Sequence, residues 1–403
     1  MLSPEQIFSI PAYVVRLYRE FEDYILADIS ERIARAGKVG SYSEWQMTRL
    51  AELNEANYFL QRAIDTLGEV SIERTVELLE SAANISSLSD GTVFALLGME
   101  APTLADSATM RQIVYGIIGQ TSGEIANITN TLGFKLPNSP FLGVMEAYQR
   151  TLDSAVLEVL TGATDYNTAI KRAVKRLCDA GLSTVLYDSG RTNKIDVAAR
   201  RAIMTGASQI SGQISEMNMQ LLGTDYVEVS AHAGARPDHA DWQGKVYKMH
   251  GAEAGYPNLE EATGYGTGEG LMGWNCRHSF SPFLVGLSKR NYSSRQLKAI
   301  DPPAFTYQGR KYTAYEATQQ QRRMETMMRQ TKREVVGYKA AGLADEFTTA
   351  SVKLRRQREL YKEFSSAAGL YEQSARTQVI GFDRSVSSLS TWAARKAKEK
   401  IAV

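Results

Sequence analysis

The chain has 403 residues, of which 43% are hydrophobic and 23% are charged, and its formal net charge is +1. This composition is globular and the length predicts two or three domains, whereas the bulk charge selects no class of partner. Two cysteines, Cys178 and Cys276, are too few for a disulfide framework and are typical of a reducing compartment. The first residues lack the pattern of a signal peptide, and no run approaches the roughly 18 apolar residues of a membrane-spanning helix. We therefore expect a soluble protein made in a cytosol.

Charge is distributed unevenly along the chain. Residues 1–120 hold 9 Lys/Arg and 17 Asp/Glu, a net charge of −8, whereas residues 301–403 hold 19 Lys/Arg and 11 Asp/Glu, a net charge of +8. An acidic front and a basic tail indicate either different partners for the two ends or two solvated helical regions that differ in charge.

The first two hundred residues have the apolar spacing of helices. Residues 11–38 place apolar side chains three or four positions apart, with Pro11 and Gly37 typical of a helix start and end. Residues 41–68 repeat the pattern, and Gly68 is predicted to end that helix. A turn is predicted over residues 135–141, and further helices over residues 73–83, 110–129, 141–162, 165–182 and 194–223.

The apolar period changes at Tyr226. Residues 226–232 alternate and predict a strand, and residues 244–249 and 278–285 are further strand candidates between glycine-rich loops. Helices return over residues 312–342 and 351–369. We expect a mainly α protein with a small α+β unit. In chain order, its regions are a helical region (1–224), the small α+β motif unit (225–290) and a basic helical tail (291–403).

All four histidines, His232, His239, His250 and His278, lie within 47 residues, and Cys276 lies among them. Zinc accepts His nitrogen and Cys thiolate in tetrahedral sites, and a metal would tie together loops that bury little apolar area. A strand end, a helix start and a Cys-x-His pair supply the predicted ligands, with zinc as the candidate cofactor: His232, His239, Cys276 and His278.

Two other interpretations of these residues remain open. The one that we favour from the residues alone is a set of hydrogen-bonded histidines beside an inert buried cysteine, because the spacing is not that of a standard zinc finger. The other is a catalytic thiolate–imidazolium pair formed by Cys276 and a histidine. The glycines of residues 263–274 resemble a phosphate loop only loosely, because the Lys-Ser/Thr ending and the following helix are missing.

The basic tail carries paired cations on predicted helices. Residues 310–362 contain thirteen Lys/Arg and six Asp/Glu. If the pairs face one side, they would contact an acidic surface, either DNA phosphates or an acidic protein face, and the alternative is a solvated helix. The predicted contact residues are Arg322, Arg323, Lys332, Arg333, Arg355 and Arg356.

Two longer strings carry a resemblance to a known family: "VSAHAGARPDHADWQGKVY" and "EATGYGTGEGLMGWNCRHSFSPF". Together with "NITNTLGF", "DYNTAIKRAV" and "VAARRAIMTGASQ", they resemble the phage minor capsid protein 2 family, which is similar to the Mu F-like head-morphogenesis proteins of tailed phages. The resemblance covers most of residues 1–340, and its most specific piece is the glycine-rich loop followed by Gly-Trp-Asn-Cys-Arg-His.

The resemblance implies a structural component of the virion head, made in the host cytoplasm, present in few copies and encoded near the portal. Portal or other capsid proteins are then the expected partners, together with packaged double-stranded DNA, and no membrane is expected. The resemblance implies no assigned enzymatic activity, and the residues show no complete catalytic set. The alternative function is a zinc-dependent or cysteine-dependent hydrolase carried in the virion.

Overall fold

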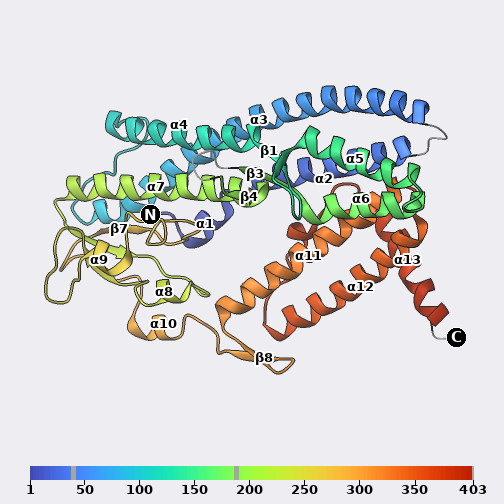
Figure 1. The fold of residues 1–403 in the computed structure, drawn as a ribbon. Coiled ribbons are helices and arrows are strands. Elements are labelled where there is room, and N and C mark those ends of the chain that lie inside the picture. Colours follow the sequence, from blue (N-terminus) through green and yellow to red (C-terminus); the bar gives the residue numbers. More distant parts are fainter. Residues whose placement is uncertain (38–41, 186–189, 402–403) are drawn as a thin grey trace. The chain divides into compact units, whose positions relative to one another are not determined.

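The computed structural model describes residues 1–37, 42–185 and 190–401. These residues are mainly helical with small antiparallel sheets, which confirms the expected fold class (Figure 1). The chain forms two compact units, each made of three separate segments. Unit 1 comprises Met1–Val15, Glu69–Ala126 and Val197–Glu316, and unit 2 comprises Arg16–Gly68, Asn127–Asp196 and Ala317–Val403. The boundaries expected near residues 224 and 290 do not coincide with the boundaries of these units.

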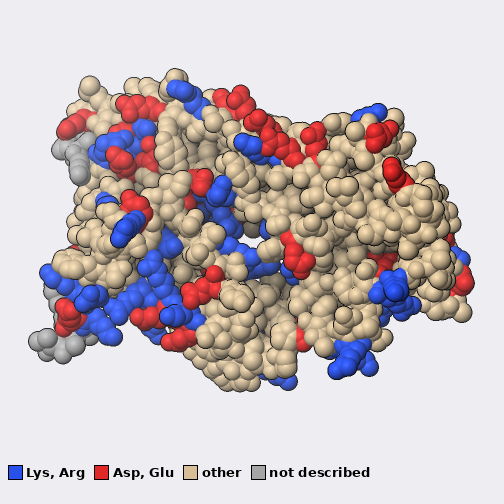
Figure 2. Space-filling model, turned by 180° about the vertical axis from the view of Figure 1, so that it is seen from behind, with Lys and Arg blue, Asp and Glu red and all other residues tan. Residues whose placement is uncertain are grey.

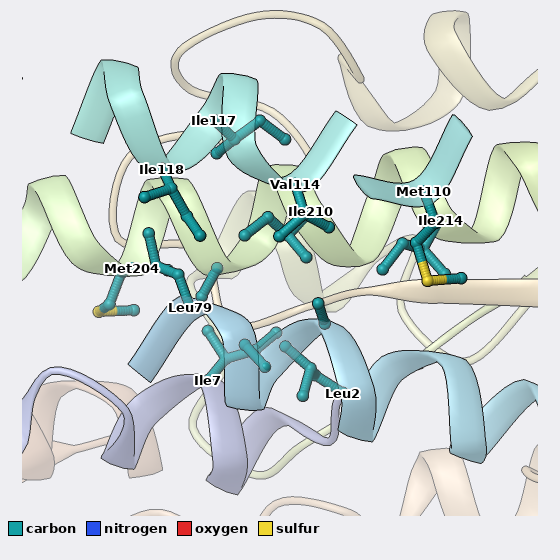
Figure 3. Close-up of a cluster of buried hydrophobic side chains, with 13 residues drawn as sticks. Leu2, Ile7, Leu79, Met110, Val114, Ile117, Ile118, Met204, Ile210 and Ile214 are labelled. Atoms are coloured by element: carbon teal, nitrogen blue, oxygen red, sulfur yellow. The ribbon is translucent and has the colours of Figure 1, made fainter. Parts of the chain in front are cut away.

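Unit 1 has a helical core. Its helices are α1 (Pro4–Ser9), the second half of α3 (Tyr42–Ala95), most of α4 (Ala108–Asn130) and most of α7 (Ile195–Leu222). Side chains from these four helices point toward one another, and Ile7, Leu79, Val114 and Ile210 are all fully buried (Figure 3). This apolar cluster fixes α7, the helix that leads directly into the small sheet of unit 1.

The small sheet of unit 1 has the antiparallel order β6-β5-β7. All three strands were predicted from the sequence, although each is shorter than its prediction. The elements of this region are β5 (Tyr226–Val229), α8 (Pro237–Ala240), β6 (Val246–Lys248), α9 (Leu259–Thr263) and β7 (Phe280–Phe283), followed by α10 (Ser294–Lys298), β8 (Phe305–Tyr307) and β9 (Arg310–Tyr312). Trp242, Tyr247, Leu271, Met272 and Phe280 are among its buried side chains, so this α+β region has a core of its own.

Unit 2 combines helices with a four-stranded antiparallel sheet of order β2-β1-β3-β4. Its strands are β1 (Leu132–Lys135), β2 (Phe141–Gly143), β3 (Leu182–Val185) and β4 (Thr192–Lys194). Its helices are α2 (Ala12–Gly37), the first half of α3, α5 (Val144–Leu160), α6 (Tyr166–Ala180), α11 (Ala314–Ala340), α12 (Ala344–Ala367), the short 3-10 helix η1 (Ser374–Thr377) and α13 (Arg384–Ile401). Among the described residues, no helix has both the length and the apolar character needed to cross a membrane.

The structure corrects two of the expected elements. Gly68 does not end a helix, because α3 continues without a break from Tyr42 to Ala95. A glycine inside a helix costs only about 1 kcal/mol, and the buried Leu67, Ser71 and Leu79 continue one packed stripe past it. The four-stranded sheet was not predicted at all, because its strands of three or four residues lie directly beside helices and three of them overlap the ends of the helices predicted over residues 141–162, 165–182 and 194–223. The predicted turn over residues 135–141 joins β1 to β2, and residues 141–143 form a strand where a helix was expected.

Candidate functional site

Two neighbouring strands bring the histidine and cysteine segments together. β5 and β7 pair antiparallel, and just beyond their ends the amide of Ser230 donates to the carbonyl of Ser279 at 2.8 Å. The segment that leaves β5 therefore runs beside the segment that enters β7. These segments carry His232 and His278, whose rings stack with their centroids 4.5 Å apart.

The third histidine comes from the short helix α8. Pro237 occupies its first turn, as expected, and His239 in its last turn is 4% exposed. The Sγ atom of Cys276 lies 3.7 Å from Nδ1 of His239 and 3.6 Å from Nδ1 of His278, and ligand atoms of all three residues lie within 4.8 Å of one another. With Zn–S near 2.3 Å and Zn–N near 2.0–2.1 Å, tetrahedral geometry puts sulfur and nitrogen ligands about 3.6 Å apart. Both measured distances fit that value.

The hydrogen bonds around His278 fix which of its nitrogens faces the cysteine. The side-chain oxygen of Gln243 accepts a hydrogen bond from the His232 amide at 3.0 Å and lies 3.1 Å from Nε2 of His278. Because that oxygen can only accept, Nε2 carries the proton and Nδ1 presents a lone pair toward Cys276. The sulfur also accepts the backbone N–H of His278 at 3.4 Å. A fixed outer hydrogen bond of this kind is the usual support of a metal-ligating histidine.

His239 is held by the glycine-rich loop. Its Nε2 lies 3.0 Å from the carbonyl oxygen of Glu269 and 2.5 Å from the guanidinium of Arg236, which also donates to that carbonyl. Two tautomers of His239 fit these contacts. If Nε2 donates to the Glu269 carbonyl, Nδ1 is free to bind a metal. If Nε2 instead accepts from Arg236, the proton lies on Nδ1 and faces the sulfur. Both arrangements direct Nδ1 at Cys276, and only the first fits a metal.

The structure brings together three of the four predicted ligands. His232 stacks on His278, but its Nδ1 lies 2.9 Å from the Ala233 carbonyl and 3.2 Å from the Arg277 guanidinium, so that nitrogen is used outside the group. His250 is exposed and pairs with Asp225 at 2.6 Å, as expected for a histidine outside the site. His239, Cys276 and His278 thus supply three ligand atoms, and a tetrahedral zinc would take a water or another group as the fourth.

In the absence of a metal, burial favours the neutral forms of His232, His239, His278 and the Cys276 thiol. It lowers the pKa of His278 to about 2 and the pKa of His232 to about 4, and it also lowers the pKa of His239. Burial raises the pKa of the Cys276 thiol, which is 3% exposed. Reactive cysteines are partly exposed and have lowered pKa values, so this geometry opposes the catalytic-cysteine interpretation.

The glycine-rich loop serves as a scaffold rather than as a phosphate cradle. Gly264 ends α9 with a positive φ of 65°, and the loop then folds back, so that a Cβ on Gly270 would overlap the Gly264 carbonyl. The Leu271 amide donates to the Thr263 carbonyl at 3.0 Å, and the Trp274 amide donates to the Gly268 carbonyl at 2.7 Å. These contacts explain why several glycines are needed, because only glycine permits such close backbone approach. They also place the Glu269 carbonyl beside His239.

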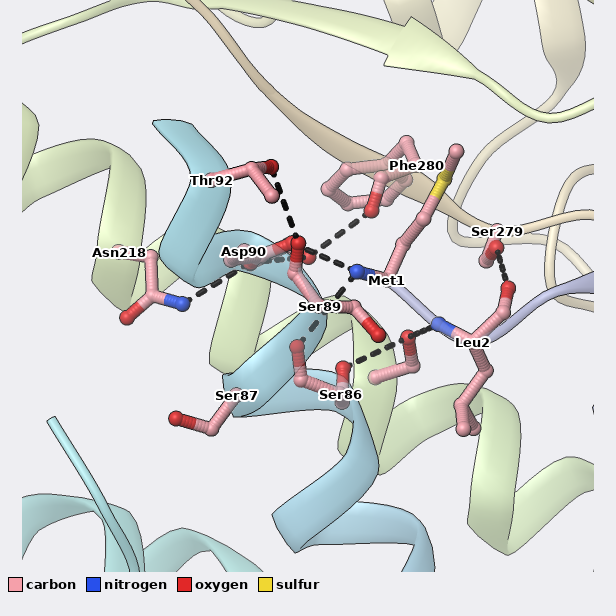
Figure 4. Close-up of polar contacts among 12 residues, drawn as sticks. Met1, Leu2, Ser86, Ser87, Ser89, Asp90, Thr92, Asn218, Ser279 and Phe280 are labelled. Carbon is pink, nitrogen blue, oxygen red and sulfur yellow. Dashed lines mark hydrogen bonds and ion pairs between the residues drawn. The ribbon is translucent and has the colours of Figure 1, made fainter. Parts of the chain in front are cut away.

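A buried polar cluster anchors the other end of the motif. Ser215 of α7 donates to the Phe280 carbonyl at 2.8 Å, and Ser279 donates to the Leu2 carbonyl at 2.5 Å (Figure 4). Asp90, which is fully buried, accepts from Asn218 at 2.9 Å and pairs with the amino group of Met1 at 2.6 Å. Strand β7 is thereby tied to the helical core of unit 1, which holds the Cys276–His278 segment in place.

The sequence profile of the phage minor capsid protein 2 family matches residues 2–365. The chain belongs to this family. The match includes both motif loops and nearly all of the two units, so the family resemblance inferred from the motifs is confirmed.

One relative of this minor capsid family member carries a functional description. It is described as "Structural protein" of Lactococcus phage LL-H and is 27% identical over 190 residues. The aligned region covers 45% of this chain and 50% of the relative, so it spans half of that protein's length. No solved structure matches the chain. The family and the relative indicate a structural phage protein rather than an enzyme.

The predicted DNA-contact residues of this minor capsid chain separate into two groups. Arg323 and Arg356 are exposed, and Arg322 and Arg355 are half-buried. Arg355 lines a cavity of 300 Å³ between α12 and α13, together with Ser351, Arg358, Glu359, Ser390, Thr391 and Arg395. Figure 2 shows Lys and Arg side chains gathered over the region of α11 to α13.

The other two predicted residues face the interior of unit 2. Arg333 is 9% exposed and pairs with Asp23 at 2.6 Å and with Glu22 at 2.5 Å. Lys332 is 8% exposed and donates to the Thr377 carbonyl. Arg333 forms internal ion pairs and both side chains are buried. The prediction that Lys332 and Arg333 face an outside partner is therefore corrected. Arg322, Arg323, Arg355 and Arg356 remain the predicted contacts, of which Arg323 and Arg356 are exposed.

Proposed function

We propose that this chain is a structural minor capsid protein of a tailed phage head that lies next to the portal and touches packaged DNA. The observation that carries the proposal is the family match over residues 2–365. The "Structural protein" description of the Lactococcus phage LL-H relative supports a place in the virion. The position next to the portal rests on the resemblance to head-morphogenesis proteins.

The charge of the chain supports a bridging role. Residues 1–120 carry a net charge of −8 and residues 301–403 a net charge of +8. Exposed Arg323 and Arg356 are suited to DNA phosphates, which cations bind without regard to base sequence. The acidic region is suited to a basic face of a neighbouring head protein.

A bound zinc ion is part of the same proposal. The S···N distances of 3.6 and 3.7 Å, the free Nδ1 lone pair of His278 and the N–H donated to the sulfur together fit a metal held by His239, Cys276 and His278. Zinc would close the small α+β region by joining α8 to the segment before β7. Its role there is structural, because all three ligand residues are buried.

Cross-linking and mass spectrometry of purified phage particles test the proposed location. The expected result is that the chain is present at few copies and forms cross-links to the portal protein. Cross-links between neighbouring copies of the major capsid protein serve as the positive control in the same sample. Absence of the chain from particles would overturn the virion role, and cross-links to tail proteins alone would overturn the position next to the portal.

DNA contact by the tail is tested with the full-length chain. We expect duplex binding that weakens steeply with salt and an Arg323→Gln/Arg356→Gln variant whose log–log salt slope is smaller by about 1.8, or 0.9 per lost phosphate contact. Arg62→Gln/Arg150→Gln, which removes two exposed charges elsewhere in unit 2, is the matched control. Equal salt slopes for both variants would show that the tail does not contact DNA.

A further inference from the structure

A basic cavity lies in unit 2, and its lining includes none of the tail residues just described. Its volume is 480 Å³, which is within the range of about 300–1,000 Å³ typical of ligand sites. It opens between the end of β1, the exposed face of α6 and β4. Its lining consists of Lys135, Pro137, Arg172, Lys175, Arg176, Asp179, Ala180 and Lys194, so that five cations meet a single carboxylate.

The one carboxylate of the lining is already committed. Asp179 accepts from Lys175 at 2.7 Å and from Gln330 at 2.6 Å, which holds it at one edge of the cavity. Among the residues that the structure describes, Arg176 and Lys194 make no ion pair with a carboxylate. Arg172 pairs with Glu158 at 3.4 Å and Lys175 with Glu334 at 3.6 Å, so the cations of the lining are only partly neutralised by carboxylates outside it.

The position of the cations follows from local structure. Lys175 and Arg176 lie three and four positions after Arg172 on α6, so they lie on the same side of that helix as Arg172, and all three are exposed. The opposite face of α6 buries Ile170, Val174 and Leu177 and fixes the helix against the core. Pairing of β4 with β3 places Lys194 opposite Ser183, next to the C-terminal end of α6. The cations are thus presented by rigid elements.

We propose that this cavity binds the backbone phosphates of double-stranded DNA. Protein partners usually anchor apolar or aromatic side chains in pockets, whereas this lining offers only Pro137 and Ala180 as apolar residues. Among the described residues, no aromatic side chain lines it, so the described lining provides no surface on which the bases of a single strand would stack. Arginine and lysine without aromatic neighbours are suited to sequence-independent contact with phosphodiester groups.

The cavity gives unit 2 a DNA contact that is separate from Arg323 and Arg356. The biological meaning of this contact rests on the proposed function, since packaged DNA is present only inside a head. The binding itself is measured on the isolated chain. Failure of the proposed function would appear in the phage particles, whereas failure of this inference would appear in the DNA-binding measurement. The two failures are therefore distinguishable.

The test uses the full-length chain and a fluorescent 24-base-pair duplex in salt titrations. Arg172→Gln/Arg176→Gln removes two exposed charges from α6 and keeps residues with good helix propensity. We expect the dissociation constant to rise about tenfold at low salt and the salt slope to fall by about 1.8. Arg62→Gln/Arg150→Gln, with the same loss of charge, should change the dissociation constant less than about twofold. Circular dichroism and the melting temperature verify that both variants fold.

Competition experiments distinguish the phosphates of DNA from those of small molecules. Inorganic phosphate, pyrophosphate and ATP are each added as competitors, and an Arg323→Gln/Arg356→Gln variant reports the tail contact separately. Weak competition that simply follows ionic strength supports the DNA assignment. Saturable binding of ATP or pyrophosphate that is lost in Arg172→Gln/Arg176→Gln would overturn it in favour of a small phosphate ligand. Equal duplex binding by the cavity variant and its control would also overturn it.

Discussion

Cys276 is buried, and yet its surroundings are suited to metal binding. Burial alone is what a space-filling cysteine requires, and Cys178 on α6 meets it at 2% exposed. The sulfur of Cys276 instead meets two imidazole nitrogens and accepts a backbone N–H from His278. These contacts favour a thiolate bound to a metal over an inert thiol.

Substitution of the proposed ligands tests this difference. We expect the wild-type chain, purified without chelators, to contain about one zinc per chain, and Cys276→Ser and His278→Ala to lose most of it. Both variants should also melt at a lower temperature, because the metal joins two loops. Elemental analysis and thermal unfolding are the measurements. His250→Ala removes an exposed histidine outside the group and should keep the zinc. Zinc-free wild-type protein of unchanged stability after chelation would contradict the proposal.

Gly270 gives a second prediction at the scale of one residue. A Cβ at this position would overlap the backbone of Gly264, which cannot move aside as a flexible side chain would. We expect Gly270→Ala to lower the free energy of unfolding by about 1–3 kcal/mol. Gly119→Ala is the matched comparison, because Gly119 is exposed on α4 with no atom near the added carbon. That change should stabilise the chain by about 0.5–1 kcal/mol. Urea unfolding measures both, and equal effects would refute this account of the loop.

The sequence predicted much of this site because its residue types are rare. Four histidines and one cysteine in a short segment indicated a meeting point, and three of the predicted ligands lie together. The sequence could not show that His232 lies outside the ligand group, because the orientation of its ring depends on contacts with the Ala233 carbonyl and Arg277. The cavity between β1, α6 and β4 was missed for a similar reason. The spacing of Arg172, Lys175 and Arg176 was visible, but the contribution of Lys194 depends on an unpredicted sheet.

At the scale of an element, α11 shows that helical periodicity does not determine which charged side chains face the interior. The pattern predicted this helix, but it could not tell which cations face inward. Arg329, Lys332 and Arg333 are all buried, and two of them meet carboxylates of segments more than a hundred residues away in the chain. A cation is rarely buried unless it is paired, so its orientation depends on partners that no local pattern reveals.

The pH dependence of stability tests the pairing at the start of α7. Burial pushes the pKa of Asp196 upward, but Arg329 and Arg19 hold it at about 2, below the ordinary 3.8. A carboxyl group whose pKa is lowered on folding contributes stability above its unfolded pKa, and that contribution disappears as the pH falls from about 4 to about 2. We expect this part of the stability to be about 2 kcal/mol.

Urea unfolding of the wild type and of Asp196→Asn at several pH values is the measurement. The wild type should be more stable at pH 6, and the difference should shrink as the pH falls below about 4. Burial raises the pKa of Asp23 to about 6, and because both proteins keep Asp23, the comparison reduces its opposite contribution. A difference that stays constant down to the lowest pH would show that Asp196 does not titrate as described.

At the scale of the whole molecule, the tail is not an independent part. Unit 2 is assembled from residues 16–68, 127–196 and 317–403, and Arg333 of α11 meets Glu22 and Asp23 of α2. We expect a fragment of residues 301–403 to lack cooperative thermal unfolding, because its buried cations would have no carboxylates. Adding a fragment of residues 1–300 should restore part of the structure. Circular dichroism measures both, and a cooperative transition in the isolated tail would contradict this view of unit 2.

The separation of these partners also sets the order of events during synthesis. Glu22 and Asp23 precede Arg333 by 311 and 310 residues, so at about 5–20 residues per second they leave the ribosome roughly 15–60 s before their partner. Throughout that interval, Glu22 and Asp23 lack the guanidinium of Arg333, and the apolar Phe21 and Ile25 lack the third segment of unit 2. A translation product that stops before α11 lacks the third segment of unit 2, so premature termination would leave Glu22 and Asp23 without Arg333.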